Sequence, residues 1–238
     1  MSLKRSLAAV EHLTIEARFN GPDGSANGGY TCGRIAALLG GNAEVTLRSP
    51  PPLERPLAIE RDADVLRVVD GESLVAEAAP GSVELDLPAP PSWDEAQAAS
   101  ARYPGFEEHA FPRCFVCGPD REPGDGLRIF AGPLGDGRFA ATWEPTEVRP
   151  ELVWAALDCP GAIAVGFPDR GETLLGRFAV TIDELPNHGE HCTVLAWPLG
   201  EDGRKLYAAT VLHGEDARPL ARARATWIAP QEDLAQYS

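Results

Sequence analysis

The chain has 238 residues, of which 44% are hydrophobic and 24% are charged, so it has the composition of a soluble globular protein with an ample core. Its formal net charge of −15 at pH 7 repels nucleic acid and anionic membranes, and we expect neither as a partner. No apolar run approaches a membrane span and the N-terminus lacks a signal-peptide core, which together predict a cytoplasmic protein.

The first half of the chain predicts a strand, a helix and then a series of strands. The first strand is Ile15–Phe19, and the helix over Ser25–Leu39 is closed by the glycine pair that follows it, a common helix C-terminal signal. Four further strands are predicted from alternating apolar residues and from the turn residues between them. They are Ala43–Arg48, Leu57–Arg61, Val65–Val69 and Leu74–Ala78.

The second half repeats this order. A hairpin is predicted over Leu127–Phe130 and Arg138–Trp143, and it is followed by Val148–Val165, the longest apolar stretch of the chain. That stretch contains several alanines and few β-branched residues, which favours a buried helix, taken as Glu151–Val165. The strands predicted after it are Gly176–Ile182, Cys192–Pro198, Leu206–Leu212 and Leu220–Ile228.

Between the halves lies Pro88–Pro112, a segment rich in Pro, Ala and Glu that predicts a surface linker with a short helical piece around Trp93–Tyr103. We therefore predict an α+β protein with one repeat at residues 1–87, a linker at 88–112 and a second repeat at 113–238. In each repeat the antiparallel strands are expected to curl around the helix.

Asp158 is the one carboxylate in the middle of the apolar stretch, where an isolated charge is costly unless it is hydrogen-bonded or used. Two interpretations are open on local sequence. Asp158 could cap a second helix that begins at Cys159-Pro160, or it could be a functional group of a buried site.

Three stretches resemble double-hotdog proteins of the thioesterase-like superfamily: ANGGY at Ala26–Tyr30, CFVCGPDREPGDGLRIF at Cys114–Phe130, and VWAALDCPGAIA at Val153–Ala164. The resemblance implies two tandem hotdog repeats, each an antiparallel sheet wrapped around a long central helix. It also implies that the two helices lie side by side and that the two sheets join edge to edge.

Single-hotdog thioesterases of the phenylacetyl-CoA type look like HGG…LLD, and in related homodimers each site combines the Asp of one helix with the Gly amides of the other. The first half of this chain keeps Asn27-Gly28-Gly29 but has Ala36 in place of the Asp. The second half keeps Asp158 but has Arg149-Pro150-Glu151 in place of His-Gly-Gly. The resemblance therefore implies one composite site and one dead site.

Thioester hydrolysis needs a base or nucleophile and donors aimed at the developing oxyanion. Gly28 and Gly29 offer backbone N–H groups at the positive end of a helix, and Asn27 adds a side-chain amide. Asp158, in an apolar wall, is expected to have a raised pKa and to act as general base or nucleophile. The alternative is that Asn27 caps the helix and that the glycines permit close packing.

The remaining predicted site residues are assigned to substrate binding. They are Tyr30, Arg34, Trp154 and Cys159. Arg34 would meet coenzyme A phosphates, Trp154 would line an acyl pocket or fill the core, and Cys159 would be a site-lining thiol or a core residue.

The five cysteines, an odd number, predict reduced thiols rather than a disulfide framework. Cys114-x-x-Cys117 suggests a metal knuckle, but tetrahedral zinc needs four ligands and no second pair follows at a fixed spacing. Further candidate ligands are His109, Cys159, His188, His191 and Cys192. We expect no metal and no other cofactor.

The predicted function is hydrolysis of an acyl-CoA or another thioester. The main alternative is a non-catalytic acyl-CoA or small-ligand binding protein of the same fold, which the missing His of the HGG motif keeps open. A hydratase is less favoured because no His follows Asp158 closely. Acyl-chain specificity and oligomeric state are left open, a homo-oligomer included.

Overall fold

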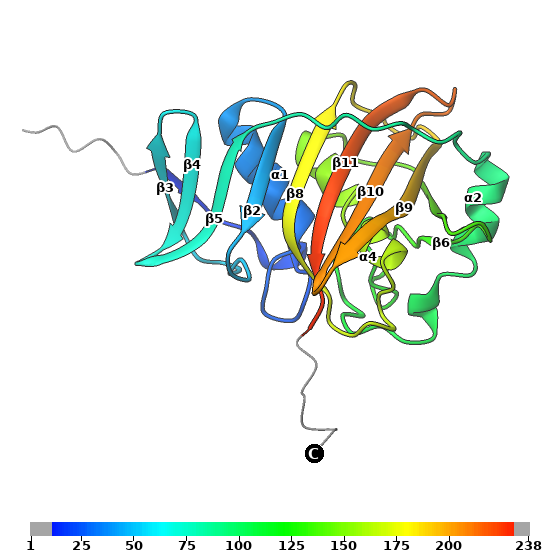
Figure 1. Cartoon of the computed structure of the whole chain (residues 1–238), viewed down its shortest axis with the longest axis horizontal. Helices are drawn as coiled ribbons and strands as arrows, with labels where there is room; N and C mark the ends of the chain where they lie inside the picture. The colour runs from blue at the N-terminus through cyan, green and yellow to red at the C-terminus, as the bar shows by residue number, and fades with distance from the viewer. Residues whose placement is uncertain (1–10, 231–238) are drawn as a thin grey trace, which may run out of the picture.

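The computed structural model describes residues 11–230, and its strands form one eleven-stranded antiparallel sheet with α1 and α4 behind it (Figure 1). The strand order is β1-β3-β4-β5-β2-β8-β11-β10-β9-β7-β6. The strands of the first half are β1 (Glu11–Leu13), β2 (Ala43–Leu47), β3 (Leu57–Asp62), β4 (Val65–Asp70) and β5 (Ser73–Pro80). Those of the second half are β6 (Gly132–Pro133), β7 (Phe139–Trp143), β8 (Leu174–Ile182), β9 (Cys192–Asp202), β10 (Lys205–His213) and β11 (Pro219–Ile228).

The two halves meet where β2 pairs with β8, in a register that runs from Ala43 opposite Val180 to Thr46 opposite Arg177. The sheet is therefore continuous across the two halves, as predicted. Read inward from each outer end, the order is β1, β3, β4, β5, β2 on one side and, after the short β6, β7, β9, β10, β11, β8 on the other. Each half thus places the strand that follows its main helix at the centre of the joint sheet.

Helix α1 (Gly28–Leu39) begins three residues later than predicted. Asn27 is its N-cap and accepts the Tyr30 N–H through Oδ1 at 2.8 Å, while Gly40 ends the helix in the left-handed conformation with φ 81°. The residue before the N-cap is bound outside the helix, because the Ala26 N–H donates to the Pro51 carbonyl. Capping therefore fixes where α1 starts.

The second predicted helix, Glu151–Val165, is broken into α3 (Pro150–Ala156) and α4 (Cys159–Ala164). Pro160 explains the break, because it has no N–H to donate to the Ala156 carbonyl four residues earlier and its ring would clash with that carbonyl. The continuous helix that the sequence analysis predicted is thus wrong at Leu157 and Asp158. This break turns the Asp158 side chain toward α1.

Two predicted strands are not strands in the structure. Ile15–Phe19 instead ends in the 3₁₀ turn η1 (Ala17–Phe19), in which the Phe19 N–H donates to the Glu16 carbonyl. Leu127–Phe130 is irregular, because Arg128 has φ 54°. The strand that pairs with β7 is β6, which lies a few residues after the predicted strand Leu127–Phe130.

The predicted helical piece of the linker is α2 (Trp93–Ser100), which begins with a capping box between Ser92 and Glu95. Another 3₁₀ turn, η2 (Pro104–Phe106), follows it. Ala96 and Ala99 are fully buried against the sheet, so α2 packs at the far end of the molecule from β3 and β4 (Figure 1). The predicted repeat boundaries at residues 87 and 113 remain predictions.

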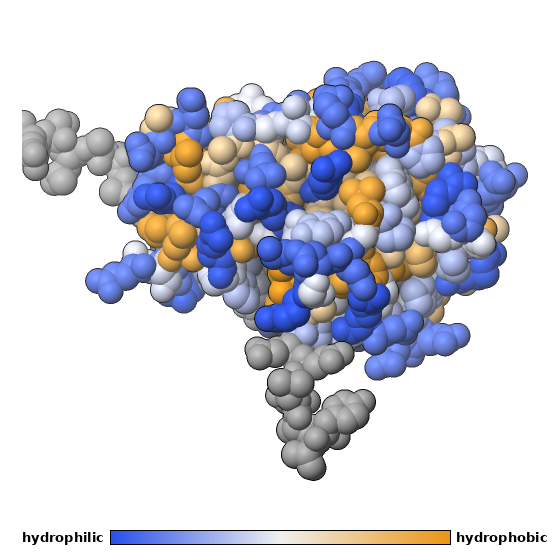
Figure 2. Space-filling model, in the orientation of Figure 1, coloured by the Kyte–Doolittle hydropathy of each residue, from blue (hydrophilic) through white to orange (hydrophobic). Residues whose placement is uncertain are grey.

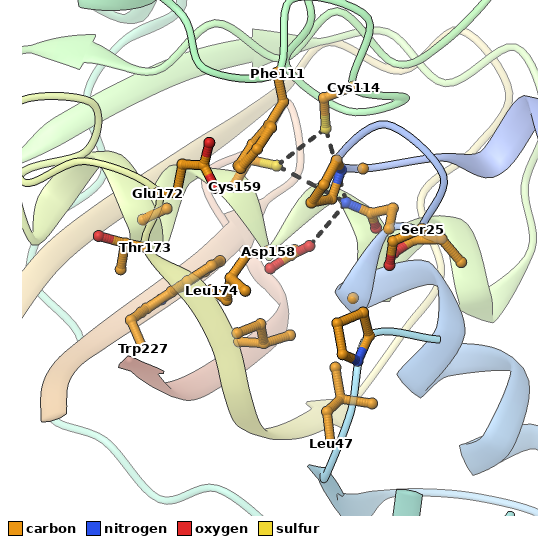
Figure 3. Close-up of a pocket in the computed structure, with 18 of the residues that line it drawn as sticks. Ser25, Leu47, Phe111, Cys114, Asp158, Cys159, Glu172, Thr173, Leu174 and Trp227 are labelled. Carbon is orange, nitrogen blue, oxygen red and sulfur yellow. Dashed lines mark hydrogen bonds between the residues drawn. The ribbon is translucent and has the colours of Figure 1, made fainter. Parts of the chain in front are cut away.

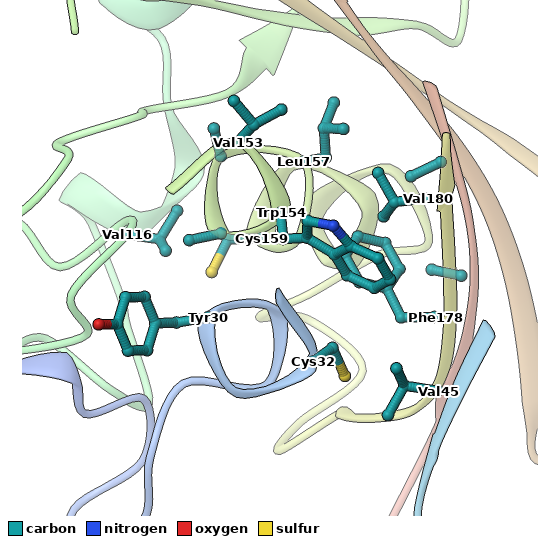
Figure 4. Close-up of a cluster of buried hydrophobic side chains, with 14 of the residues drawn as sticks. Tyr30, Cys32, Val45, Val116, Val153, Trp154, Leu157, Cys159, Phe178 and Val180 are labelled. Atoms are coloured by element: carbon teal, nitrogen blue, oxygen red, sulfur yellow. The ribbon is translucent and has the colours of Figure 1, made fainter. Parts of the chain in front are cut away.

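The core lies between the sheet and the paired helices α1 and α3. Trp154 of α3 is 2% exposed and meets the Phe178 ring edge-on, with ring centroids 5.6 Å apart (Figure 4). The face of the sheet turned to the viewer in Figure 2 is a mixture of hydrophilic and hydrophobic residues. Within residues 11–230, no helix is both long and apolar enough to cross a membrane.

Candidate active site

Asp158 reaches from the break between α3 and α4 to the start of α1. Its Oδ2 accepts the Gly29 N–H and the Asn27 Nδ2–H, each at 2.9 Å. The residue is 2% exposed, and although it occupies the N-cap position of α4 its side chain makes no capping hydrogen bond there. Of the two interpretations left open by the sequence, the helix cap is therefore right about the position of Asp158 but wrong about its side chain, which does not cap α4.

Two glycines of α1 allow this close approach. A Cβ on Gly29 would lie 2.4 Å from the Asp158 Cβ, and one on Gly33 would lie 2.7 Å from the Glu151 Cα. No side chain fits at either position without moving the neighbouring helix. The glycines therefore bring α1 and α3 together and seat the carboxylate on the backbone of α1.

The first turn of α1 has N–H groups that no intrahelical carbonyl can satisfy. The Asn27 N–H donates to the Phe19 carbonyl at 2.7 Å, the Tyr30 N–H to the Asn27 side chain, and the Gly29 N–H to Asp158. Among the residues that the structure describes, the Gly28 N–H is left without such a partner. Gly28 also lines the adjacent cavity.

Burial raises the pKa of Asp158 to about 7, because desolvation disfavours the carboxylate more than the Gly29 and Asn27 hydrogen bonds favour it. Cys114 adds a smaller upward contribution to that pKa. The second oxygen, Oδ1, is buried and has no hydrogen-bond partner among residues 11–230. Asp158 is thus anchored by one oxygen and has the other free to accept a proton.

A cavity of about 480 Å³ opens beside these groups, between the start of α1, helix α4 and the ends of β8 and β11 (Figure 3). Its wall is mostly apolar. The apolar lining includes Leu47, Phe111, Ala162, Ile163, Phe167, Leu174, Leu175 and Trp227. The basic residues in the wall are Arg48 and His109, and Arg48 is already paired with Glu77 at 2.7 Å. The cavity is therefore suited to an apolar group rather than to phosphates.

The predicted catalytic residues Asn27, Gly28, Gly29 and Asp158 meet at one point. Asn27, Gly28 and Asp158 line the cavity together with Cys159. The other predicted substrate-binding residues lie outside the cavity wall. Tyr30 is 1% exposed and stacks on Phe19 with ring centroids 3.8 Å apart, and Arg34 lies beside the Tyr30 hydroxyl at 3.4 Å. Trp154 belongs to the core.

Trp227, Phe111 and Leu175 were not predicted from the sequence as site residues. They come from β11, the segment before Cys114, and β8, and none of them lies within the three motif stretches. Their apolar side chains carry no signal that separates a cavity wall from an ordinary core. Only the fold brings them together at the cavity.

Three cysteines also meet at the cavity. The sulfur atoms of Cys114, Cys117 and Cys159 all lie within 4.8 Å of one another, and each of these residues is buried. The expectation of no metal rested on the lack of a second ligand pair at fixed spacing, and the fold brings Cys159 to the Cys-x-x-Cys segment without such a spacing. His188, His191 and Cys192 are not part of this cluster.

The predicted dead site lies at the start of α3. Arg149 is the N-cap there but makes no capping hydrogen bond, and it pairs with Glu147 at 3.2 Å and with Glu151 at 3.1 Å. Pro150 has no N–H to offer a ligand. Ala36, the counterpart of Asp158 in the motif, is buried and carries no carboxylate.

No protein-family profile matches the chain, and no curated protein matches it. Solved structures do match over almost its whole length. A protein of unknown function with a hotdog fold from Alicyclobacillus acidocaldarius has a TM-score of 0.64 at 11% identity, covering 93% of each chain. The chain has the hotdog fold.

Two further solved structures similar to this chain are named as TesB proteins. The acyl-CoA thioesterase II TesB2 of Mycobacterium marinum has a TM-score of 0.57 at 9% identity, covering 94% of this chain and 97% of its own. The TesB protein of Mycobacterium avium subspecies paratuberculosis has a TM-score of 0.59 at 11% identity, covering 89% and 90%. At such identities the likeness establishes the fold and leaves the activity to be argued from the site.

Proposed function

We propose that this protein hydrolyses acyl-CoA thioesters at the Asp158 site, with Asp158 as general base or nucleophile. The observation that carries the proposal concerns the two oxygens of Asp158. One is held by Gly29 and Asn27, while the other is buried beside an apolar cavity and has no hydrogen-bond partner among residues 11–230. An anchored carboxylate with a free oxygen is the arrangement that proton abstraction from a water requires.

In the general-base form, Asp158 takes a proton from a water whose oxygen attacks the thioester carbonyl carbon. The carbonyl oxygen becomes an oxyanion, which the Gly28 N–H stabilises. The carbon–sulfur bond then breaks, and the thiolate leaves with the proton from Asp158. The Gly29 N–H, which was also expected to polarise the carbonyl, is bound to Asp158 and holds the base instead.

The cavity supports an apolar acyl chain as the buried part of the substrate. The coenzyme A portion, with its phosphates, would lie outside, because the one arginine of the wall is already paired with a glutamate. The proposal includes two tandem hotdog repeats that share this one site. The matching strand order of the two halves and the pairing of β2 with β8 favour that arrangement.

A non-catalytic acyl-CoA binding protein is the second candidate. It is favoured by the occupied Gly29 N–H, which leaves the Gly28 N–H as the sole donor identified at the start of α1 for an oxyanion. It is also favoured by Asn27, which stands where the related enzymes carry a histidine.

The test is thiol release from a panel of acyl-CoA esters by wild type, Asp158→Asn and Glu151→Gln. Removing the base is expected to lower the rate about a hundredfold or more. Glu151 lies on α3 and pairs with Arg149 away from the cavity, so Glu151→Gln is the matched control and should keep the wild-type rate. Equal turnover by wild type and Asp158→Asn would refute the mechanism. Binding of the esters without turnover in all three proteins would support the binding function.

A further inference from the structure

Three buried thiols from two distant parts of the chain gather next to Asp158. Cys114 and Cys117 lie in an irregular segment, and Cys159 is the first residue of α4. The Cys114 and Cys159 sulfurs are 3.7 Å apart (Figure 3). All three sulfurs lie within 4.8 Å of one another. All five cysteines of the chain are free thiols in the structure.

We propose that Cys114, Cys117 and Cys159 bind one zinc ion. The sulfur ligands of tetrahedral zinc, with Zn–S bonds of about 2.3 Å, lie about 3.8 Å apart, which is close to the Cys114–Cys159 separation. The Gly118 N–H donates to the Cys114 carbonyl at 2.9 Å, so Cys114 and Cys117 lie on one tight turn. Thiolate ligands select zinc among the common divalent ions.

His109 is assigned as a hydrogen-bond donor to this site rather than as a ligand. Its Nδ1 accepts the Phe111 N–H at 2.9 Å, so the proton of the neutral ring is on Nε2. Nε2 lies 3.4 Å from the Cys117 sulfur and donates to it. The fourth position of the ion then falls to a water molecule from the cavity, which all three cysteines line.

Asn27 supplies the second donor to the sulfurs. Its Nδ2 lies 3.9 Å from the sulfurs of both Cys114 and Cys159 and also donates to Asp158. On binding zinc the three thiols release their protons to solvent, so the site carries one net negative charge and no electron is transferred. The N–H donors of Asn27 and His109 offset that charge.

The ion would also join two parts of the fold. Residues 107–131 contain no helix or strand, yet Phe115 and Val116 in their middle are fully buried. A zinc ion shared by Cys114, Cys117 and Cys159 would cross-link this irregular segment to the start of α4, 45 residues later in the chain than Cys114. It would therefore also fix the backbone next to Asp158.

The test is the metal content of protein purified without chelator, measured by mass spectrometry for wild type, Cys159→Ala and Cys32→Ala. Cys32 is also buried and free but lies on α1 outside the cluster, so it is the matched control. We expect one zinc per chain in wild type and in Cys32→Ala, and its loss in Cys159→Ala. Zinc retained in full by Cys159→Ala would overturn the assignment.

Cobalt substitution keeps the proposal testable if a cysteine variant does not fold. Wild-type protein freed of metal under reducing conditions and then given Co²⁺ should develop the intense visible and thiolate charge-transfer absorption of a tetrahedral site. His109→Gln should develop it as well, because His109 is not a ligand. Wild type that contains no zinc and shows no such absorption would overturn the proposal, whatever its thioesterase activity.

Discussion

The Asp158 carboxylate accepts the Gly29 N–H at 2.9 Å although the two residues are 129 positions apart in the chain. This bond joins the break after α3 to the first turn of α1. It exists because Gly29 has no side chain and because Pro160 stops α3 from continuing through Asp158. The site therefore depends on Gly29, which has no side chain, and on Pro160, which has no N–H to donate.

Gly29→Ala is expected to destabilise the fold and abolish turnover. The added Cβ would lie 2.4 Å from the Asp158 Cβ, and overpacking of this kind costs about 1–3 kcal/mol. Gly41→Ala is the control, because a Cβ there meets nothing within 4 Å. Urea unfolding of both variants checks the prediction, and a Gly29→Ala protein as stable and active as Gly41→Ala would contradict it.

Asn27 has two separable roles, as the cap of α1 through Oδ1 and as a donor to Asp158 through Nδ2. Asn27→Ala loses both and is expected to cost about 1 kcal/mol in the free energy of unfolding. Asn27→Ser keeps a capping oxygen but not the amide donor, so it should recover most of the stability and none of the lost activity. Unfolding and thiol-release measurements on both variants check this prediction. Recovery of activity by Asn27→Ser would contradict it.

Trp227 and Trp154 are both buried, but only Trp227 lines the cavity. Trp227→Phe should enlarge the cavity and shift the preferred acyl-CoA toward longer or bulkier chains. Trp154→Phe removes volume from the core, so it should lower the unfolding free energy and leave the order of acyl preference unchanged. Comparison of kcat/KM across the ester panel for the two variants separates a cavity residue from a core residue.

Much of the sheet was predictable because its strands alternate apolar and polar residues between clear turn signals. The β2–β8 join was expected from the resemblance of the two halves, not from the residues at the join. Pro160 indicated a helix break near Asp158. The long apolar run and the long central helix implied by the family resemblance instead favoured one continuous helix. Tyr30 and Arg34 were assigned to substrate binding, yet their positions on α1 carry both side chains away from the cavity.

The sequence named Cys159 as one of five candidate ligands beside Cys114 and Cys117, but it could not single Cys159 out, for a different reason. Cys159 and the Cys-x-x-Cys pair are joined by a segment whose path follows neither helical nor strand periodicity at its start. Spacing rules recognise ligands that one turn or one hairpin brings together. They do not reach ligands that meet only after the irregular segment has folded back onto α4.

His213 gives the chain a specific sensitivity to acid. The side chain is 2% exposed at the end of β10, its Nδ1 has no partner among the described residues, and desolvation lowers its pKa to about 4. Between the unfolded pKa of about 6.5 and the folded value, the unfolded chain binds a proton that the folded chain does not. Stability is therefore lost as the pH falls through this window, by at most about 3 kcal/mol from this residue.

His213→Gln removes the titrating group, so the unfolding free energy of the variant should fall less than that of wild type between pH 7 and about 4. A constant cost of the substitution itself cancels, because the comparison is of each protein with itself at two pH values. Urea unfolding at both pH values measures the difference. Parallel pH profiles for the two proteins would mean that His213 is protonated in the folded state and that its burial does not oppose its charge.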